Sequence, residues 1–207
     1  MNDRNSLSVA ALVLAGGKSS RMGRDKALIL WDVNTILQRV CQVASECCQQ
    51  VYILTPWPDR YRDILLKQYQ FLPESKPSNG PLVGLADGLA QINTTWVLLL
   101  ACDMPLLETV IIQLWINKLY IIPKDRLALV PKHADRWEPL CAFYRKEALP
   151  ELQQFLHQGG RSFQSWFERI PVQAIPIGEL AAKMLSNCNT HEDLDRLGKL
   201  NQHGIWE

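Results

Sequence analysis

Length, composition and charge set the first limits on what this protein can be. The chain has 207 residues, of which 47% are hydrophobic and 21% charged, as is typical of a globular chain that can bury a substantial core. The 22 lysines and arginines nearly balance the 21 aspartates and glutamates, leaving a formal net charge of +1. Without a strong field of either sign, neither a nucleic acid nor a membrane is predicted as a partner, and any bound phosphate must be held by a local cluster.

The six cysteines and an apolar run near the start of the chain bear on its location. None of the cysteines forms a C-x-x-C pair, so we interpret them as reduced, mostly buried residues of a cytoplasmic protein. The apolar run 9–15 follows Asp3 and Arg4, whose charges cancel, and it is far shorter than the ~20 residues of a membrane span. We therefore interpret it as a buried strand and not as a signal peptide.

The predicted elements begin with a strand at 9–14, which is rich in branched and apolar residues and ends at two adjacent glycines. A loop follows. Apolar residues at three- and four-residue spacing then predict a helix over 35–49, with Asn34 as its N-cap. The apolar run 51–55 predicts the second strand.

The same alternation of apolar runs and helical patterns continues along the rest of the chain. Further strands are predicted at 69–72, 96–101, 127–130, 140–144 and 172–176, and helices at 60–68, 81–92, 108–117, 150–157, 162–169 and 190–200. Strands joined by crossover helices predict an α/β fold of three layers, α/β/α and Rossmann-like, around a mostly parallel sheet. The sequence contains neither a repeat nor a linker, so we expect residues 1–207 to form a single domain.

The loop after the first strand is where function is expected, because ligands in such folds bind beyond the carboxyl ends of the strands. Residues 14–29 read LAGGKSSRMGRDKALI. Gly16 and Gly17 allow the backbone to approach a ligand closely, and Arg21 and Lys26 add two cations suited to a polyphosphate.

Three interpretations of this loop compete on the residues alone. A Walker A motif would begin with a glycine five residues before Gly17, and that position holds Leu12. A dinucleotide-binding fingerprint would need G-x-G-x-x-G in place of adjacent glycines. A solvated basic loop would need no ligand.

Asp103 is the second candidate, because it directly follows the apolar run 96–101. An aspartate at the end of a strand is commonly a turn residue or a helix cap. It also suits Mg²⁺, which prefers oxygen ligands and takes one or two protein carboxylates together with water and substrate phosphates.

The loop string L-A-G-G-x-S-x-R-M-G-x-D-K resembles the signature loop of the molybdenum cofactor guanylyltransferases, within the larger nucleotidyltransferase family. Its short ending, Asp25-Lys26, differs from the longer loop of the sugar-phosphate nucleotidyltransferases, which ends in Pro-Lys. Further strings resemble segments of the same family: C-D-M-P at 102–105, G-P-L-x-G at 80–84 and N-x-N-T-x-E-D-L at 187–194.

This resemblance implies a nucleotidyltransferase fold and the transfer of GMP from GTP to the terminal phosphate of molybdopterin, with Mg²⁺ as cofactor and pyrophosphate as product. It implies Arg21, Lys26 and Asp103 as catalytic residues, with Asp103 on the metal. The N-terminal half would bind the nucleotide and the C-terminal half the acceptor. Other proteins of molybdenum cofactor biosynthesis and recipient molybdoenzymes would be partners. The implied nucleotide-binding residues are Leu14, Ala15, Gly16, Gly17, Lys26, Thr55, Glu74, Gly80, Pro81 and Asp103, and the implied acceptor-side residues are Arg161, Ser162, Asn187 and Asn189.

Departures from the family pattern leave the nucleobase open. Glu74 stands where an aspartate is usual, Thr55 where some relatives place asparagine, and His191 where proline is common. One alternative is a cytidylyltransferase acting on molybdopterin or another small phosphate acceptor, although such relatives tend to carry A-A-G where this chain has A-G-G. Another alternative is a catalytically inactive nucleotide-binding adaptor that delivers the cofactor to partner enzymes.

Overall fold

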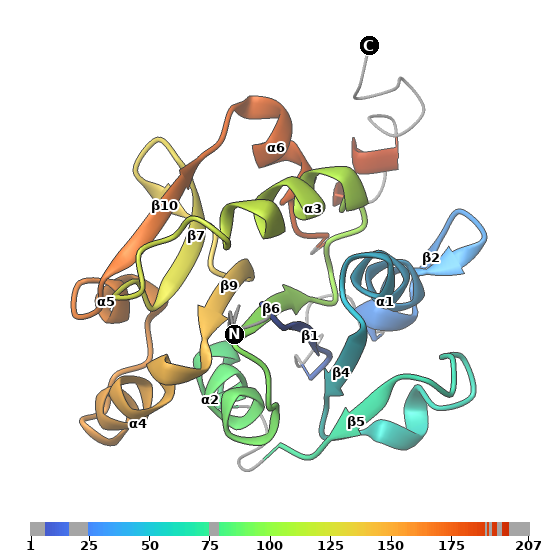
Figure 1. Cartoon of the computed structure of the whole chain (residues 1–207). Helices are drawn as coiled ribbons and strands as arrows, with labels where there is room; N and C mark the ends of the chain where they lie inside the picture. Colours follow the sequence, from blue (N-terminus) through green and yellow to red (C-terminus); the bar gives the residue numbers. More distant parts are fainter. Residues whose placement is uncertain are drawn as a thin grey trace, which may run out of the picture.

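An eight-stranded sheet runs through the described part of the chain (Figure 1). The structure is a computed structural model and describes residues 7–16, 25–74, 79–188, 190, 192–193 and 196–198. The sheet comprises β1 (Val9–Leu14), β4 (Gln50–Leu54), β5 (Gln70–Leu72), β6 (Trp96–Ala101), β7 (Ala128–His133), β8 (Arg136–Trp137), β9 (Cys141–Arg145) and β10 (Val172–Pro176). A separate hairpin is formed by β2 (Leu30–Trp31) and β3 (Asn34–Thr35). The α-helices are α1 (Ile36–Cys47), α2 (Pro81–Gln91), α3 (Thr109–Lys118), α4 (Leu149–His157), α5 (Phe163–Phe167) and α6 (Glu179–Met184).

The first strand of the chain lies inside the sheet. β1 pairs in parallel with β4 on one side and with β6 on the other. The strand order is β10-β7-β9-β6-β1-β4-β5, and β8 pairs with β7. β9 runs antiparallel to its neighbours β6 and β7, while the other strands of this path share one direction. The predicted α/β fold with a mostly parallel sheet is confirmed.

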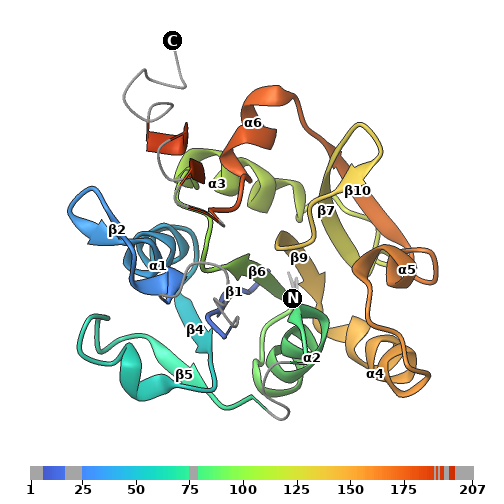
Figure 2. The same ribbon diagram turned by 180° about the vertical axis from the view of Figure 1, so that it is seen from behind.

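The helices cover the two faces of the sheet in two groups (Figures 1 and 2). α1, α3 and α6 lie over one face, and α2, α4 and α5 over the other. Side chains of β1 alternate between them: Ala11 and Val13 are buried with the first group, Ala10 and Leu12 with the second. Every residue of β6 is buried, as its continuous apolar run predicts.

Glycines on α2 allow this helix to lie close to β1. A Cβ atom on Gly88 would collide with the Cδ2 atom of Leu12. A Cβ atom on Gly84 would lie 3.1 Å from the Cδ2 atoms of both Leu14 and Leu54. The two glycines are four residues apart, so they lie on one face of the helix and present a flat surface to the ends of β1 and β4.

Helix α1 begins with a capping box at Thr35. The Thr35 hydroxyl accepts from the backbone N–H of Gln38 (3.2 Å), and the Gln38 side chain accepts from the backbone N–H of Thr35 (2.8 Å). The predicted N-cap, Asn34, was therefore wrong by one residue, because the glutamine three residues after Thr35 completes the reciprocal pair.

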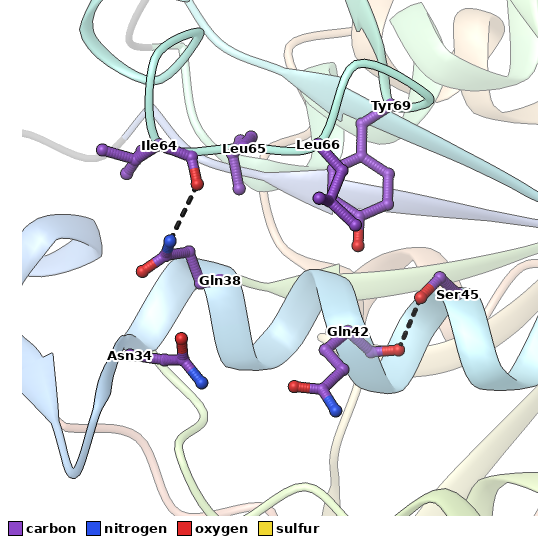
Figure 3. A pocket seen from close by; sticks show the side chains of 8 residues that line it. All are labelled: Asn34, Gln38, Gln42, Ser45, Ile64, Leu65, Leu66 and Tyr69. Atoms are coloured by element: carbon purple, nitrogen blue, oxygen red, sulfur yellow. Dashed lines mark hydrogen bonds between the residues drawn. The ribbon is translucent and has the colours of Figure 1, made fainter.

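The predicted helix at 60–68 is wrong. Only the short 3₁₀ helix η2 (Pro58–Arg60) forms, and turns follow it. Figure 3 shows the segment from Ile64 to Tyr69 lying across α1, where the Gln38 Nε2 atom donates to the carbonyl of Ile64 (2.8 Å). The apolar residues Ile64, Leu65 and Leu66 are consecutive and do not share one helical face. A pocket of about 220 Å³ lies between this segment and α1.

Short elements were not predicted, and the predicted closing helix is only partly described. The hairpin of β2 and β3, the strand β8 and the helix α6 are additional to the prediction. Within 190–200, Thr190 and Asp193 exchange two hydrogen bonds of 3.0 Å, as at the start of a helix. The rest of that range falls largely outside the described residues. Among the helices that the structure describes, none is long and apolar enough to cross a membrane.

Candidate active site

The carboxyl ends of three parallel strands meet at one edge of the sheet. Leu14, the last residue of β1, pairs with Leu54 of β4 and with Ala101 of β6. Backbone hydrogen bonds between neighbouring strands continue just past these ends. The N–H of Ala15 donates to the carbonyl of Leu54 (2.9 Å), and the N–H of Cys102 donates to the carbonyl of Leu14 (3.2 Å). The segments that follow β1, β4 and β6 therefore start side by side.

Gly16 lies directly against Glu74 and Pro56. A Cβ atom on Gly16 would collide with the Oε1 atom of Glu74 and would lie 3.0 Å from the Cδ atom of Pro56. The glycine thus lets the carboxylate of Glu74 approach the backbone of the loop. Thr55, which precedes Pro56, is buried, and its hydroxyl accepts from the N–H of Trp57 (3.1 Å). Gly17 and Arg21 lie outside the described residues.

Lys26 and Asp103 come together at this edge. Burial raises the pKa of Asp103, and the positive charge of Lys26 acts in the opposite direction. The Oδ1 atom of Asp103 is buried, and no described residue gives it a hydrogen bond. Burying a carboxylate oxygen without a hydrogen-bond partner raises the free energy of the folded state. A bound cation would offset this increase.

The surroundings of Asp103 bear on the two roles considered for it. The N-cap of α3 is Glu108, so Asp103 does not cap the helix that follows β6. Among the described residues, no group of three His, Cys, Asp or Glu side chains comes together to hold a metal. A single carboxylate such as that of Asp103 is compatible with Mg²⁺, which takes one or two protein carboxylates with water and substrate phosphates.

The closing part of the chain returns to this edge. The N–H of Cys188 donates to the main-chain carbonyl of Asp103 (2.8 Å). Burial raises the pKa of Cys188 to about 11, with Asp193 and Asp103 adding to the effect and Lys26 opposing it. Asn187 is half-buried beside Cys188, and Asn189 lies outside the described residues.

The G-P-L-x-G string forms the start of α2. Gly80 precedes the helix with φ of +90°, a conformation that L side chains rarely adopt. Pro81 occupies the first turn, where its missing N–H is not needed. Gly84 contacts Leu14 and Leu54, so the amino end of α2 lies at the same edge as the strand ends.

Arg161 and Ser162 lie in the loop between α4 and α5. The guanidinium of Arg161 donates to the carbonyls of Leu156 (3.1 Å) and Gly160 (2.6 Å), and Ser162 is the N-cap of α5 without a side-chain bond. These contacts tie the two residues to α4 and α5, and none of them joins the residues to the cluster at the strand ends.

Two side chains that support the site had no signal in the sequence. The Nε atom of Arg39 on α1 donates to the carbonyl of Pro105, and its Nη2 atom lies 3.8 Å from Glu108, so Arg39 holds the segment after Asp103. The hydroxyl of Tyr61 donates to Asp25 (2.7 Å). Arg39 lies on a helix that also carries Gln38 and Gln42, so its place in the sequence does not set it apart.

A mostly parallel sheet, a glycine loop ending in a lysine and an acidic residue after the neighbouring strand define an α/β nucleotidyltransferase. A sequence profile of the MobA-like NTP transferase domain matches residues 11–173. The chain belongs to this family.

Similar proteins agree with this assignment. A protein of Nostoc sp. (strain PCC 7120), described as a probable molybdenum cofactor guanylyltransferase, is 50% identical over 187 residues, which are 90% of this chain and 89% of the relative. A protein of Trichormus variabilis with the same description is 51% identical over 189 residues, with the same coverage. In fold, molybdopterin-guanine dinucleotide biosynthesis protein A from Archaeoglobus fulgidus superposes with a TM-score of 0.76 at 24% identity, over 94% of this chain and 100% of that one.

Proposed function

We propose that this chain is a molybdenum cofactor guanylyltransferase, which moves GMP from GTP to the terminal phosphate of molybdopterin and releases pyrophosphate. The family and the two relatives at about half identity over nine-tenths of the chain support this activity. The product is molybdopterin guanine dinucleotide. GTP and molybdopterin are then the substrates.

The structural observation that carries the proposal is the buried Oδ1 of Asp103 beside Lys26, at the ends of β1 and β6. The acceptor phosphate is already a competent nucleophile near neutral pH, so no deprotonating base is required. The barrier is electrostatic, because an anionic oxygen must approach an anionic triphosphate. Fixed positive charge and positioning lower such a barrier.

Each residue at this edge has a role in that reaction. The backbone of Leu14, Ala15 and Gly16 receives the nucleotide, together with Gly17. Lys26 binds the phosphates, and Arg21 adds a second cation. Asp103 holds Mg²⁺, which neutralises phosphate charge when bound. The remaining nucleotide-binding residues in the proposal are Thr55, Glu74, Gly80 and Pro81.

The described geometry supports these assignments in two ways. Glu74 lies against Gly16, where its carboxylate is able to accept hydrogen bonds from the base or the ribose. The amino end of α2 faces the same edge, and the first turn of a helix favours an anion. Apart from this geometry, a mycobacterial protein of similar fold (TM-score 0.67, 18% identity) has been solved as a complex with manganese, a divalent cation like Mg²⁺.

The C-terminal half would bind molybdopterin. We assign Asn187 and Asn189 to the acceptor because Cys188 bonds to the carbonyl of Asp103. We propose separately that Arg161 and Ser162 bind the phosphate of the pterin. The whole chain would act as one nucleotidyltransferase domain in the cytoplasm, together with other proteins of molybdenum cofactor biosynthesis and the molybdoenzymes that receive the product.

A direct comparison of nucleotides tests the guanylyl assignment. Purified protein with molybdopterin and Mg²⁺ should release pyrophosphate faster from GTP than from CTP, ATP or UTP. Equal or better turnover of CTP would support the cytidylyltransferase alternative, for which Glu74 in place of an aspartate is the motivating observation. Binding of GTP without any pyrophosphate release would support the adaptor.

A further inference from the structure

The carboxylate of Asp25 is held on three sides. Its Oδ1 atom accepts from the N–H of Ala27 (3.1 Å), and its Oδ2 atom accepts from the hydroxyl of Tyr61 (2.7 Å). The Nη1 atom of Arg60 lies 3.7 Å from the same Oδ2. We call Asp25, Arg60 and Tyr61 the Asp25 cluster. Both oxygens of Asp25 have partners, in contrast to the Oδ1 atom of Asp103.

Tyr61 is built into the core beneath this carboxylate. Its side chain is 1% exposed and packs in the same hydrophobic cluster as α1. Burial, followed by the bond to Asp25, raises the pKa of Tyr61, so the hydroxyl stays protonated and donates. Arg60 stacks over the ring of Trp57 at 4.3 Å, which holds the guanidinium beside Asp25.

These contacts fix the chain immediately before Lys26. Asp25 is the N-cap of the 3₁₀ helix η1 (Lys26–Leu28), so the contacts of its side chain also constrain the backbone from which Lys26 extends. The charge of Lys26 acts on Asp103. A carboxylate next to Lys26 in sequence could compete for its ammonium group, and the partners of Asp25 counter this competition.

The glycine loop is thereby bound at both of its described ends to one region of the fold. At its start, the N–H of Ala15 donates to Leu54 at the end of β4. At its end, Asp25 binds Arg60 and Tyr61, which follow β4 in the chain. β4 and the segment after it therefore hold both described ends of the loop.

We infer that Tyr61 and Arg60 are positioning residues, which hold Asp25 so that Lys26 faces Asp103 and the phosphates of the nucleotide. The inference rests on the proposed function, because it assumes that Lys26 binds those phosphates. Tyr61 and Arg60 themselves act through Asp25 and Lys26.

Tyr61→Phe tests the inference, because it removes the hydroxyl and keeps the ring. The turnover number for pyrophosphate release should fall roughly tenfold, the order expected for a lost hydrogen bond to a charged group. Tyr144→Phe is a matched control: the Tyr144 side chain is also buried and its hydroxyl donates to the carbonyl of Pro139 (2.8 Å). Both variants should lose similar thermal stability, and Tyr144→Phe should keep the wild-type turnover.

Arg60→Gln should lower turnover less than Tyr61→Phe, because Arg60 is more exposed and its ion pair is longer.

A double-mutant cycle with Lys26→Ala separates positioning from a general loss of structure. If Tyr61 acts through Lys26, Tyr61→Phe should have little further effect on turnover in the Lys26→Ala protein. Turnover is measured with whichever nucleotide the wild-type protein prefers, so a wrong base assignment leaves the test valid. The dissociation constant for GTP with Mg²⁺ provides a second reading, and it should rise in Tyr61→Phe alone of the two tyrosine variants.

The possible outcomes are distinct. If turnover falls in the Lys26→Ala protein but is unchanged in the Tyr61→Phe protein, the positioning role is overturned and the proposed function stands. The same loss from Tyr61→Phe in both backgrounds also overturns it, because the effect would then bypass Lys26. Wild-type turnover in Lys26→Ala removes both the proposed role of Lys26 and the inference. A wild-type protein that releases no pyrophosphate fails the proposed function, and the GTP dissociation constants then decide the inference.

Discussion

At the scale of single residues, Asp103 is the position where a structural role and a catalytic role make opposite predictions. Asp103→Asn keeps the shape of the side chain and its ability to accept a hydrogen bond, but it removes the negative charge that Mg²⁺ requires. We expect the variant to melt at or above the wild-type temperature, because it removes a buried negative charge whose Oδ1 atom has no described hydrogen-bond partner. It should lose nearly all pyrophosphate release and need far more Mg²⁺ for the remainder.

The measurement for Asp103 is a titration of rate against Mg²⁺ concentration, beside a melting curve of each protein. Asp193→Asn provides a matched substitution at an aspartate whose carboxylate accepts from the N–H of Thr190. A near-normal titration for Asp103→Asn would remove the metal from the proposed mechanism.

Lys26 carries the second prediction at this scale. Lys26→Ala should lower turnover on the order of 100- to 1,000-fold, which is typical for the loss of one charge-stabilising donor. The fold should persist, because a loop lysine rarely supports a core. Turnover and circular dichroism of the purified variant check both parts. Lys118→Ala, at the end of α3, is the control for removing a lysine elsewhere.

The sequence pointed to the candidate residues for chemistry but not to the side chains that contact them. Gly16, Lys26 and Asp103 lie in strings whose composition and spacing are distinctive, and in the structure the charge of Lys26 acts on Asp103. Tyr61 is far from Asp25 in the sequence, and nothing in the spacing of the two residues indicates a contact. The contact exists because the turns after β4 fold back over α1.

At the scale of elements, the close packing of α2 against β1 gives a test of the fold. Gly88→Ala places a methyl group where the Leu12 side chain lies, and overpacking of this kind costs about 1–3 kcal/mol of unfolding free energy. A Cβ atom on Gly178 would meet nothing within 4 Å, so Gly178→Ala should change stability little. Urea denaturation of both variants measures the difference. Equal midpoints would show that β1 and α2 have room to move apart.

The elements predicted well are those whose apolar pattern is distinct. β1, β6 and β10 coincide with their predicted ranges, and for β1 and β6 the reason is that each is a mostly buried apolar run. The two-residue strands β2, β3 and β8 are too short to show any period. The prediction at 60–68 failed because its apolar residues Ile64, Leu65 and Leu66 are consecutive and do not share one helical face.

At the scale of the whole molecule, the six cysteines test how completely the chain is packed. All six are free, as expected, and four of them are buried. Burial raises the pKa of Cys41 and Cys48 to about 12, and that of Cys47 and Cys188 to about 11. At pH 8 only about one in a thousand of the most acidic of these thiols is ionised. Alkylation of the native protein should therefore be slow and accelerate about tenfold for each unit of pH.

Mass spectrometry after timed alkylation checks this prediction residue by residue. Cys47, which is only half-buried, should react before the buried Cys41 and Cys48, and all six should react rapidly in denaturant. Addition of GTP and Mg²⁺ should slow Cys188 in particular, because its backbone is bonded to Asp103. Rapid labelling of Cys41 in native protein at pH 8 would contradict the packing described.

The position of β1 also has a consequence for the protein during its synthesis. β1 leaves the ribosome before both of its neighbours, β4 and β6, and it becomes an interior strand of the finished sheet. Until both of these later strands have been synthesised, the apolar segment of β1 has no strand partner on at least one edge. Unpaired apolar strands are prone to aggregate. A nascent chain halted between β4 and β6 should therefore depend on chaperones more than one halted after β6, and ribosome profiling of chaperone-bound chains would reveal this dependence.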